Sequence, residues 1–249
     1  MNSPQNIYDD PTFFAGYKSL RETGAGLNEA LEQPALWSLL PDRLDNLRAL
    51  DLGCGFGDFA RAARKRGARE VLALDPSANM LARAAELTHD DDIHYARASI
   101  ESFSGKGAFD LAVSSLAMHY VEHYANAVAR VAQCLVPGGR FVFSVEHPIC
   151  TALPSQQWVR DSDGNPLHWP VDAYRNEGPR STKWFVDGVV KYHRTVETYV
   201  NVLLDCGLCL RRLLEPEPQT GEAARHVPDV DLHRRRPPFL LLAAEKPSA

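Results

Sequence analysis

The sequence predicts an α/β fold in which a parallel sheet is covered by helices on both faces. Three observations support this prediction. Strand-like and helix-like segments alternate over residues 47–145, the candidate strands are short and apolar, and a glycine-rich turn joins the first strand to the first helix. Folds of this kind bind ligands at the carboxyl ends of their strands, so polar residues at those ends are the candidates for function.

Each expected element has its own signal in the sequence. The strands are apolar runs that end in polar residues, and Pro76 suits the first turn of a helix. Apolar residues recur at helical spacing over 121–135, and the triplet 137–139 (Pro-Gly-Gly) ends that helix. In chain order we expect strand 47–52, helix 58–66, strand 70–74, helix 76–87, strand 93–98, strand 109–114, helix 121–135, strand 140–145, helix 195–206, strand 208–214 and strand 239–244.

Residues 146–191 break this pattern. The segment is rich in Pro, Trp, Tyr, Asp and Gly and shows no clear period. A stretch of this length inside a compact domain is typical of a lid or a binding insertion, and its aromatic residues argue against disorder. Nearer the C-terminus, the basic run 233–236 is interpreted as a solvated turn in a Pro-rich loop.

The most informative motif is Asp-Leu-Gly-Cys-Gly-Phe-Gly at residues 51–57. Glycines at alternating positions let the chain turn sharply and let a ligand approach its backbone. A dinucleotide fingerprint read from Gly53 would need glycine at position 58, where Asp58 stands; read from Gly55, it would place this negative charge beside a pyrophosphate. The alternatives are therefore a site for a different anionic or carboxylate group and an ordinary glycine-rich turn.

Polar residues follow the next strands at the same edge of the expected sheet. The Asp75 carboxylate can accept two ribose hydroxyls, and its alternative role is to cap the next helix. Ser99 and Ile100 follow the third strand, where an adenine ring would lie. Met80 and Met118 are soft side chains that suit an adenine or a sulfonium, with core packing as the alternative.

Motifs beyond the glycine turn extend a resemblance to the class I S-adenosylmethionine (SAM)-dependent methyltransferases. The turn resembles their first motif, and the segments 71–81 (VLALDPSANML), 109–120 (FDLAVSSLAMHY) and 135–148 (LVPGGRFVFSVEHP) resemble later motifs in the correct order. These segments are most similar to the small-molecule branch, which includes ubiquinone/menaquinone-biosynthesis and malonyl-carrier methyltransferases. The absence of an N-P-P-Y or D-P-P-Y tetrapeptide after the fourth strand disfavours a nucleobase amine as the target.

The resemblance implies a Rossmann-like, doubly wound, seven-stranded sheet, mostly parallel with an antiparallel last strand. It also implies one methyltransferase domain over 1–249, with a helical cap (1–46), a SAM-binding core (47–145), a substrate-binding insertion or lid (146–195) and a C-terminal helix with two strands (196–249). Tyr17 and Arg21, one turn apart on an expected N-terminal helix, would cover SAM and pair with its carboxylate, with surface display as the alternative for Arg21. The SAM-binding residues implied are Tyr17, Arg21, Asp51, Gly53, Gly55, Gly57, Asp75, Pro76, Met80, Ser99, Ile100, Ser115 and Met118.

Methyl transfer from a sulfonium is an in-line displacement that needs an aligned nucleophile and often a base. His119, Glu146 and His147 stand at strand ends and are the three candidate bases, each with a structural role as its alternative. Four residues of the insertion are candidates for substrate contact, and helix-start packing is the alternative for the last two: Tyr174, Trp184, Tyr192 and His193. The expected function is methylation of a small metabolite at O, N or C. One alternative is a SAM-using reaction with another outcome, such as cyclisation of SAM. The others are a non-catalytic SAM-binding protein and, more remotely, a nicotinamide enzyme.

Composition narrows the class of partner. The chain has 249 residues and a formal net charge of −5, which argues against a large nucleic-acid interface. It has no apolar run of the roughly 20 residues that a bilayer requires, and no secretory signal pattern at its start. Five cysteines, an odd number, suggest reduced thiols and a cytoplasmic protein, and they offer no zinc site. We expect a monomer or a homodimer.

Overall fold

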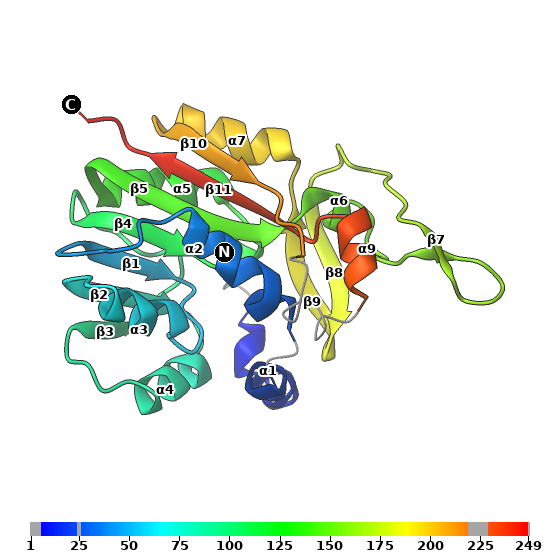
Figure 1. Ribbon diagram of the computed structural model, residues 1–249, viewed down its shortest axis with the longest axis horizontal. Coiled ribbons are helices and arrows are strands. Elements are labelled where there is room, and N and C mark those ends of the chain that lie inside the picture. Colours follow the sequence, from blue (N-terminus) through cyan, green and yellow to red (C-terminus); the bar gives the residue numbers. More distant parts are fainter. Residues whose placement is uncertain (1–5, 24–25, 219–228, 249) are drawn as a thin grey trace.

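The computed structural model describes residues 6–23, 26–218 and 229–248. A seven-stranded sheet crosses the molecule, and its strand order is β10-β11-β5-β4-β1-β2-β3 (Figure 1). In this order the strands are β10 (Cys209–Leu214), β11 (Phe239–Glu245), β5 (Leu135–Glu146), β4 (Phe109–Ser114), β1 (Arg48–Leu52), β2 (Glu70–Asp75) and β3 (Ile93–Arg97).

The pairing of these strands confirms the expected fold. Strands β1 to β5 run parallel to one another, whereas β11 is antiparallel to both β5 and β10, with Leu242 opposite Phe143. The chain moves outward from β1 to β3 and then returns to place β4 on the other side of β1. Ligands of doubly wound sheets bind at such a reversal, because the flanking connections leave opposite faces there.

Each face of the sheet carries its own hydrophobic core. The helices concerned are α2 (Gln33–Ser38), α3 (Asp58–Lys65), α4 (Ala78–Glu86), α5 (Tyr124–Cys134) and α7 (Val196–Asp205). Leu36 of α2 and Phe59 of α3 pack in the core on one face, and Val128 of α5 and Tyr199 of α7 pack in the core on the other. The apolar spacing along each helix is thus explained by one buried face.

An N-terminal group of helices lies at the carboxyl end of the sheet (Figure 1). It consists of η1 (Ile7–Asp9), α1 (Pro11–Thr23) and the π-helix η2 (Asn28–Glu32), which continues into α2. Aromatic edge contacts hold this group together: the Tyr8 ring lies 4.9 Å from Phe13 and 5.3 Å from Tyr17, centroid to centroid.

The expected boundary between helix 121–135 and strand 140–145 is wrong by several residues. Helix α5 ends at Cys134, and β5 begins at Leu135 and includes Gly138 and Gly139. These two glycines exchange backbone hydrogen bonds with Lys246 after β11 (Gly138 N to Lys246 O, 2.8 Å; Lys246 N to Gly139 O, 2.9 Å). The Pro-Gly-Gly sequence, which is expected to form a turn, is therefore part of the β-sheet because a distant segment supplies its hydrogen-bond partners.

The segment without a period contains regular structure. Its elements are α6 (Pro148–Thr151), β6 (Val159–Arg160), β7 (Pro166–His168), β8 (Gly178–Trp184) and β9 (Val186–His193). In β9 the buried positions alternate as Val189, Lys191 and His193. Two of these three inward residues are polar, so the alternation was invisible as a hydrophobic pattern.

The basic run near the C-terminus is also more ordered than expected. Residues 230–235 form the short helix α9 (Val230–Arg235). The Arg236 guanidinium lies over the ring of Trp169 at 4.1 Å, so this run packs against the insertion.

Candidate active site

A cavity of about 640 Å³ opens at the carboxyl ends of the parallel strands. It extends from the glycine turn after β1 to the hairpin β8–β9 and to α9. Fourteen of the residues expected from the sequence line it together: Tyr17, Arg21, Asp51, Gly53, Gly55, Asp75, Pro76, Met80, Ser99, Ile100, Ser115, His119, Glu146 and Trp184.

The three glycines of the turn have different roles. All three have a positive φ. A Cβ at Gly53 would stand 2.4 Å from the Ala117 Cβ, and one at Gly57 would stand 2.0 Å from the Tyr95 hydroxyl. A Cβ at Gly55 would meet nothing within 4 Å. Gly57 does not line the cavity, so its glycine is explained by packing, whereas Gly55 presents its backbone to open space.

Asp75 connects the end of β2 to the glycine turn. Its Oδ2 accepts a 3.0 Å hydrogen bond from the amide of Gly55, and its Oδ1 accepts one of 2.9 Å from the amide of Ser77. The cap of α4 is the Ser77 hydroxyl, which accepts from the amide of Met80. The alternative in which Asp75 caps this helix is therefore wrong. Burial raises the pKa of Asp75 to about 6.

Asp51 is buried at the end of β1 and lines the cavity. Its Oδ2 has no hydrogen-bond partner in the described part of the chain. Burial, together with the charges of Asp75 and Asp58, raises its pKa to about 8. A buried carboxyl oxygen without a partner is costly unless a ligand or water completes it, so Oδ2 is available to a polar group of a ligand in the cavity.

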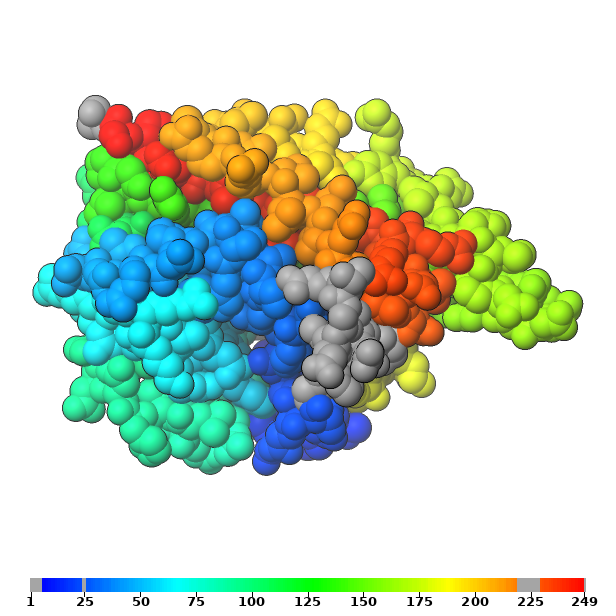
Figure 2. Space-filling model, viewed as in Figure 1, coloured from blue at the N-terminus to red at the C-terminus, as the bar shows by residue number. Residues whose placement is uncertain are grey.

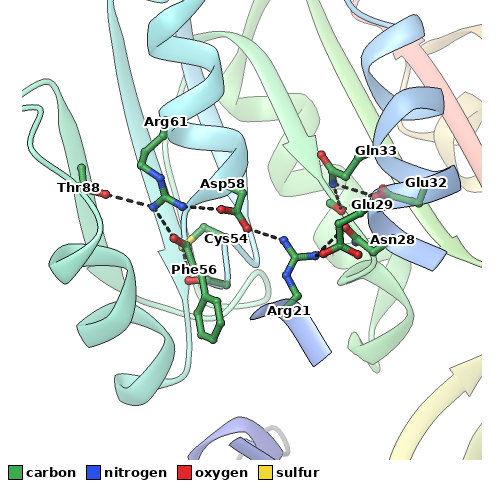
Figure 3. Close-up of polar contacts among 12 residues, drawn as sticks. Arg21, Asn28, Glu29, Glu32, Gln33, Cys54, Phe56, Asp58, Arg61 and Thr88 are labelled. Carbon is green, nitrogen blue, oxygen red and sulfur yellow. Dashed lines mark hydrogen bonds and ion pairs between the residues drawn. The ribbon is translucent and has the colours of Figure 1, made fainter. Parts of the chain in front are cut away.

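Arg21 connects α1 to the start of α3 (Figure 3). Its guanidinium pairs with Asp58 and with Glu29, each at 2.5 Å, and donates to Asn28 Oδ1 at 2.8 Å. Asp58 in turn pairs with Arg61. Arg21 is thus anchored at the cavity wall rather than displayed on the surface, and Asp58, which excluded a pyrophosphate, is its partner.

His119 and Glu146 are adjacent in the cavity wall. The backbone amide of Glu146 donates to His119 Nδ1 at 3.3 Å. Burial lowers the pKa of His119 to about 3, so the ring is neutral. With Nδ1 accepting, the ring proton lies on Nε2, and His119 presents a donor rather than a base.

His147 is not among the residues that line the cavity. Its Nδ1 accepts from the amide of Ile149 at the start of α6, and its Nε2 lies 2.7 Å from Glu215 Oε1. Both ring nitrogens have structural partners, so the alternative role holds for this residue.

Comparisons with known proteins agree with this arrangement. Residues 50–143 match the family model described as a methyltransferase domain. The fold also matches an S-adenosylmethionine-dependent methyltransferase from Mesorhizobium loti with a TM-score of 0.81 and 45% identity, over 89% of this chain and 100% of the other. The chain belongs to the class I SAM-dependent methyltransferases. SAM, the expected cofactor, is the methyl donor of this family.

Two curated relatives of the methyltransferase differ in how much of it they cover. An uncharacterized protein of Haemophilus influenzae is 33% identical over 99% of both chains. A malonyl-[acyl-carrier protein] O-methyltransferase of Enterobacter lignolyticus is 41% identical over 111 residues, which are 44% of this chain and 43% of that protein. The expected resemblance to the malonyl-carrier branch is confirmed for less than half of either chain.

The remaining predicted contacts of the methyltransferase lie outside the cavity lining. Met118 is fully buried in the core around α5. His193 is held by Thr151 Oγ1 at 2.8 Å and the carbonyl of Tyr174 at 2.9 Å, and the Tyr174 hydroxyl accepts from the amide of Val196 at the start of α7. Tyr192 lies under the Arg194 guanidinium, 5.5 Å from its ring centroid. Of the four expected substrate contacts, the structure brings only Trp184 to the cavity.

Sequence reasoning missed Lys191, whose side chain is 7% exposed. Its Nζ pairs with Glu146 Oε1 and lies 5.1 Å from the ring centroid of Trp184 and 6.0 Å from that of Tyr120. Burial alone would lower the pKa of Lys191, but Glu146 raises it, so the pair is ionic. The only indication in the sequence is the inward position of Lys191 in β9, and this position can be recognised only once the strand register is known.

Some features that commonly accompany other enzyme classes are absent from the described residues. Over 6–23, 26–218 and 229–248, no three or more His, Cys, Asp or Glu side chains gather as metal ligands. In the same part of the methyltransferase, no helix has the length and apolar character needed to span a bilayer.

Proposed function

We propose that this methyltransferase transfers the methyl group of SAM to O, N or C of a small metabolite in the cavity described above. The observation that carries the proposal is the cavity itself, which has one half lined by the SAM motifs and another lined by β9, α6 and α9. One continuous space of about 640 Å³ accommodates a nucleoside-sized donor beside a small acceptor. The net charge of −5 favours a small molecule over a nucleic acid.

The donor half has groups that fit SAM. Asp75 would accept the ribose hydroxyls, Ser99 and Ile100 would contact adenine, and Gly55 would lie against the amino-acid end. The orphan Oδ2 of Asp51 fits an ammonium donor, which is the kind of group that this buried acceptor lacks. Tyr17 and Arg21 would close this half from the N-terminal side.

The acceptor half has groups that can orient a nucleophile. SAM supplies an electrophilic methyl group on a positively charged sulfur. Glu146 is paired through Oε1 with Lys191, and its buried Oε2 has no partner among the described residues. Burial alone would raise the pKa of Glu146, but the Lys191 ammonium holds it below its ordinary value. We assign Glu146 the role of accepting a hydrogen bond from the acceptor group, with the His119 Nε2–H as a neighbouring donor.

A direct experiment tests the proposal. The protein is incubated with methyl-labelled SAM and a bacterial metabolite extract, and the products are identified by mass spectrometry. We expect S-adenosylhomocysteine together with a labelled small molecule. Methylthioadenosine in place of S-adenosylhomocysteine would indicate cyclisation of SAM, and SAM binding without turnover would indicate a non-catalytic protein.

Calorimetry tests the donor site separately from turnover. Asp75→Ala should weaken S-adenosylhomocysteine binding at least tenfold, because a ribose bound to this carboxylate makes charge-assisted hydrogen bonds. Asp205→Ala, an exposed aspartate at the end of α7, is the matched control and should bind normally. Equal affinities in the two variants would refute the ribose assignment.

A further inference from the structure

At the far end of the cavity, the guanidinium of Arg236 lies against the indole rings of Trp158 and Trp169. The Arg236 guanidinium lies 4.1 Å from the ring centroid of Trp169 and 6.0 Å from that of Trp158. The two indoles meet edge to face at 5.5 Å, and Trp169 Nε1 donates to the carbonyl of Ile149 at 2.8 Å. In the space-filling view, α9 lies against the yellow-green β6–β7 segment that carries them (Figure 2). Stacking of this kind fixes a guanidinium while leaving its in-plane N–H groups free to bind.

Three side chains at this end have buried polar atoms whose hydrogen bonds no described residue satisfies. Arg236 Nε, Gln156 Nε2 and His233 Nδ1 are buried without a hydrogen-bond partner in the described part of the chain. All three residues line the cavity, and they come from two separate segments, the turn after α6 and helix α9 with its end. Burial and the Arg236 charge lower the pKa of His233, so the neutral ring can donate from Nδ1. Buried donors left unpaired in this way are costly, which indicates that they serve a bound acceptor.

The charges at this end decide the kind of acceptor. Lys191 is already neutralised by Glu146. No carboxylate of the described residues lies within ion-pair distance of Arg236, and its polar neighbour is the Cys150 thiol, whose pKa it lowers against the larger effect of burial. Asp229, at the start of α9, also lines the cavity and limits the total positive charge. The end therefore has one cation without an ion-pair partner among the described residues and two neutral donors. Because Glu146 and Asp229 line the same cavity, its net positive charge is small, which suits a single negative charge better than a doubly charged phosphate.

We propose that Arg236, Gln156 and His233 form a carboxylate-binding subsite and that the methyl acceptor is a small organic acid. This inference rests on the proposed function, since it names the class of metabolite that the acceptor half receives. The carboxylate lies on the arginine fork, and the rest of the molecule extends toward Glu146 and the donor half. The two indoles of the insertion fix the position of the Arg236 guanidinium in this subsite. This role explains why aromatic residues gather in a segment without hydrophobic periodicity.

Equilibrium dialysis tests the subsite without requiring turnover. The protein loaded with S-adenosylhomocysteine is dialysed against the anionic fraction of a bacterial metabolite extract, and retained compounds are identified by mass spectrometry. We expect retained carboxylic acids, and a loss of retention of about ten- to a hundredfold in Arg236→Met, as removal of a charged hydrogen bond implies. Gln156→Leu should weaken the same compounds and provides a second variant should Arg236→Met fold poorly.

Arg235→Met is the matched control. Arg235 also stacks on Trp158, at 4.9 Å, but it donates to the carbonyls of Pro166 and Leu167 and does not line the cavity. It should retain the acids at the wild-type level. The inference would be overturned if Arg236→Met and Gln156→Leu retained the acids as well as wild type does. Retention of phosphate esters alone, or of no acid, by the wild-type protein would also overturn it. S-adenosylhomocysteine binding, measured first for each protein, separates these outcomes from a failure of the proposed function.

Discussion

The Ser144 hydroxyl on β5 donates a 2.5 Å hydrogen bond to Oε1 of Glu32, which lies at the end of η2. The same oxygen accepts from the Ser115 hydroxyl at 3.0 Å. Ser144 also accepts from the amide of Leu116, whose φ is 50°. A single buried carboxylate on the N-terminal group thus supports the strained loop after β4, which lines the cavity.

Glu32 makes stability depend on pH. Burial raises its folded-state pKa from 4.5 to about 7. Between these two values the folded protein binds more protons than the unfolded chain, so the free energy of unfolding falls as pH rises, by up to about 1.4 kcal/mol per unit of pH. We expect Glu32→Gln to be more stable relative to wild type at pH 8 than at pH 5, as measured by urea unfolding. Parallel pH profiles for the two proteins would contradict this assignment.

Asp51 should couple cofactor binding to proton release. Its pKa of about 8, raised by burial, leaves it largely protonated at neutral pH, and an ammonium group bound beside it would favour the ionised form. S-adenosylhomocysteine affinity should therefore rise as pH increases toward 8. Calorimetry of wild type and Asp51→Asn across this range checks the prediction, because the variant should lose most of the pH dependence. The same slope in both proteins would place the ammonium elsewhere.

The stability of the protein should fall much more when one partner of the Lys191–Glu146 pair is removed than when both are removed. Lys191→Met leaves a buried carboxylate without its counter-charge, which costs about 3–5 kcal/mol. Adding Glu146→Gln removes that charge and should recover a large part of the loss. Urea unfolding of the two single variants and the double variant measures the coupling. Additive effects would show that the two groups do not depend on each other.

Gly57 and Gly55 should respond differently to alanine. Gly57→Ala adds both a left-handed strain (φ 76°) and a clash with Tyr95, whose hydroxyl lies 2.9 Å from Thr88 Oγ1. We expect a loss of about 2–4 kcal/mol, against about 1–2 kcal/mol for Gly55→Ala, where only the backbone strain applies. Thermal or urea unfolding compares them, and equal losses would mean that Tyr95 moves aside freely.

Part of the site could be read from the sequence because its signals are local. Asp75 follows an apolar strand, and its carboxylate meets Gly55 since parallel strands end at one edge of the sheet. For His147 the sequence left the choice between a base and a structural role open, because its partner Glu215 is 68 residues away and no sequence pattern indicates that contact. Lys191 escaped notice because a buried lysine resembles a surface lysine until its register and counter-ion are known.

The sequence by itself determined the succession of core strands along the chain and the glycine turn, because periodicity and turn chemistry act over a few residues. The family and its methyl donor followed from the resemblance of its motifs. Only the tertiary structure decided which polar side chains share the cavity. The positions of Arg236, Lys191 and Glu32 depend on packing between segments far apart in the chain, and the pKa shifts of Lys191 and Glu32 follow from that packing. The acceptor half that we propose depends on non-local contacts such as those of Arg236 and Lys191, so it could be recognised only in the folded chain.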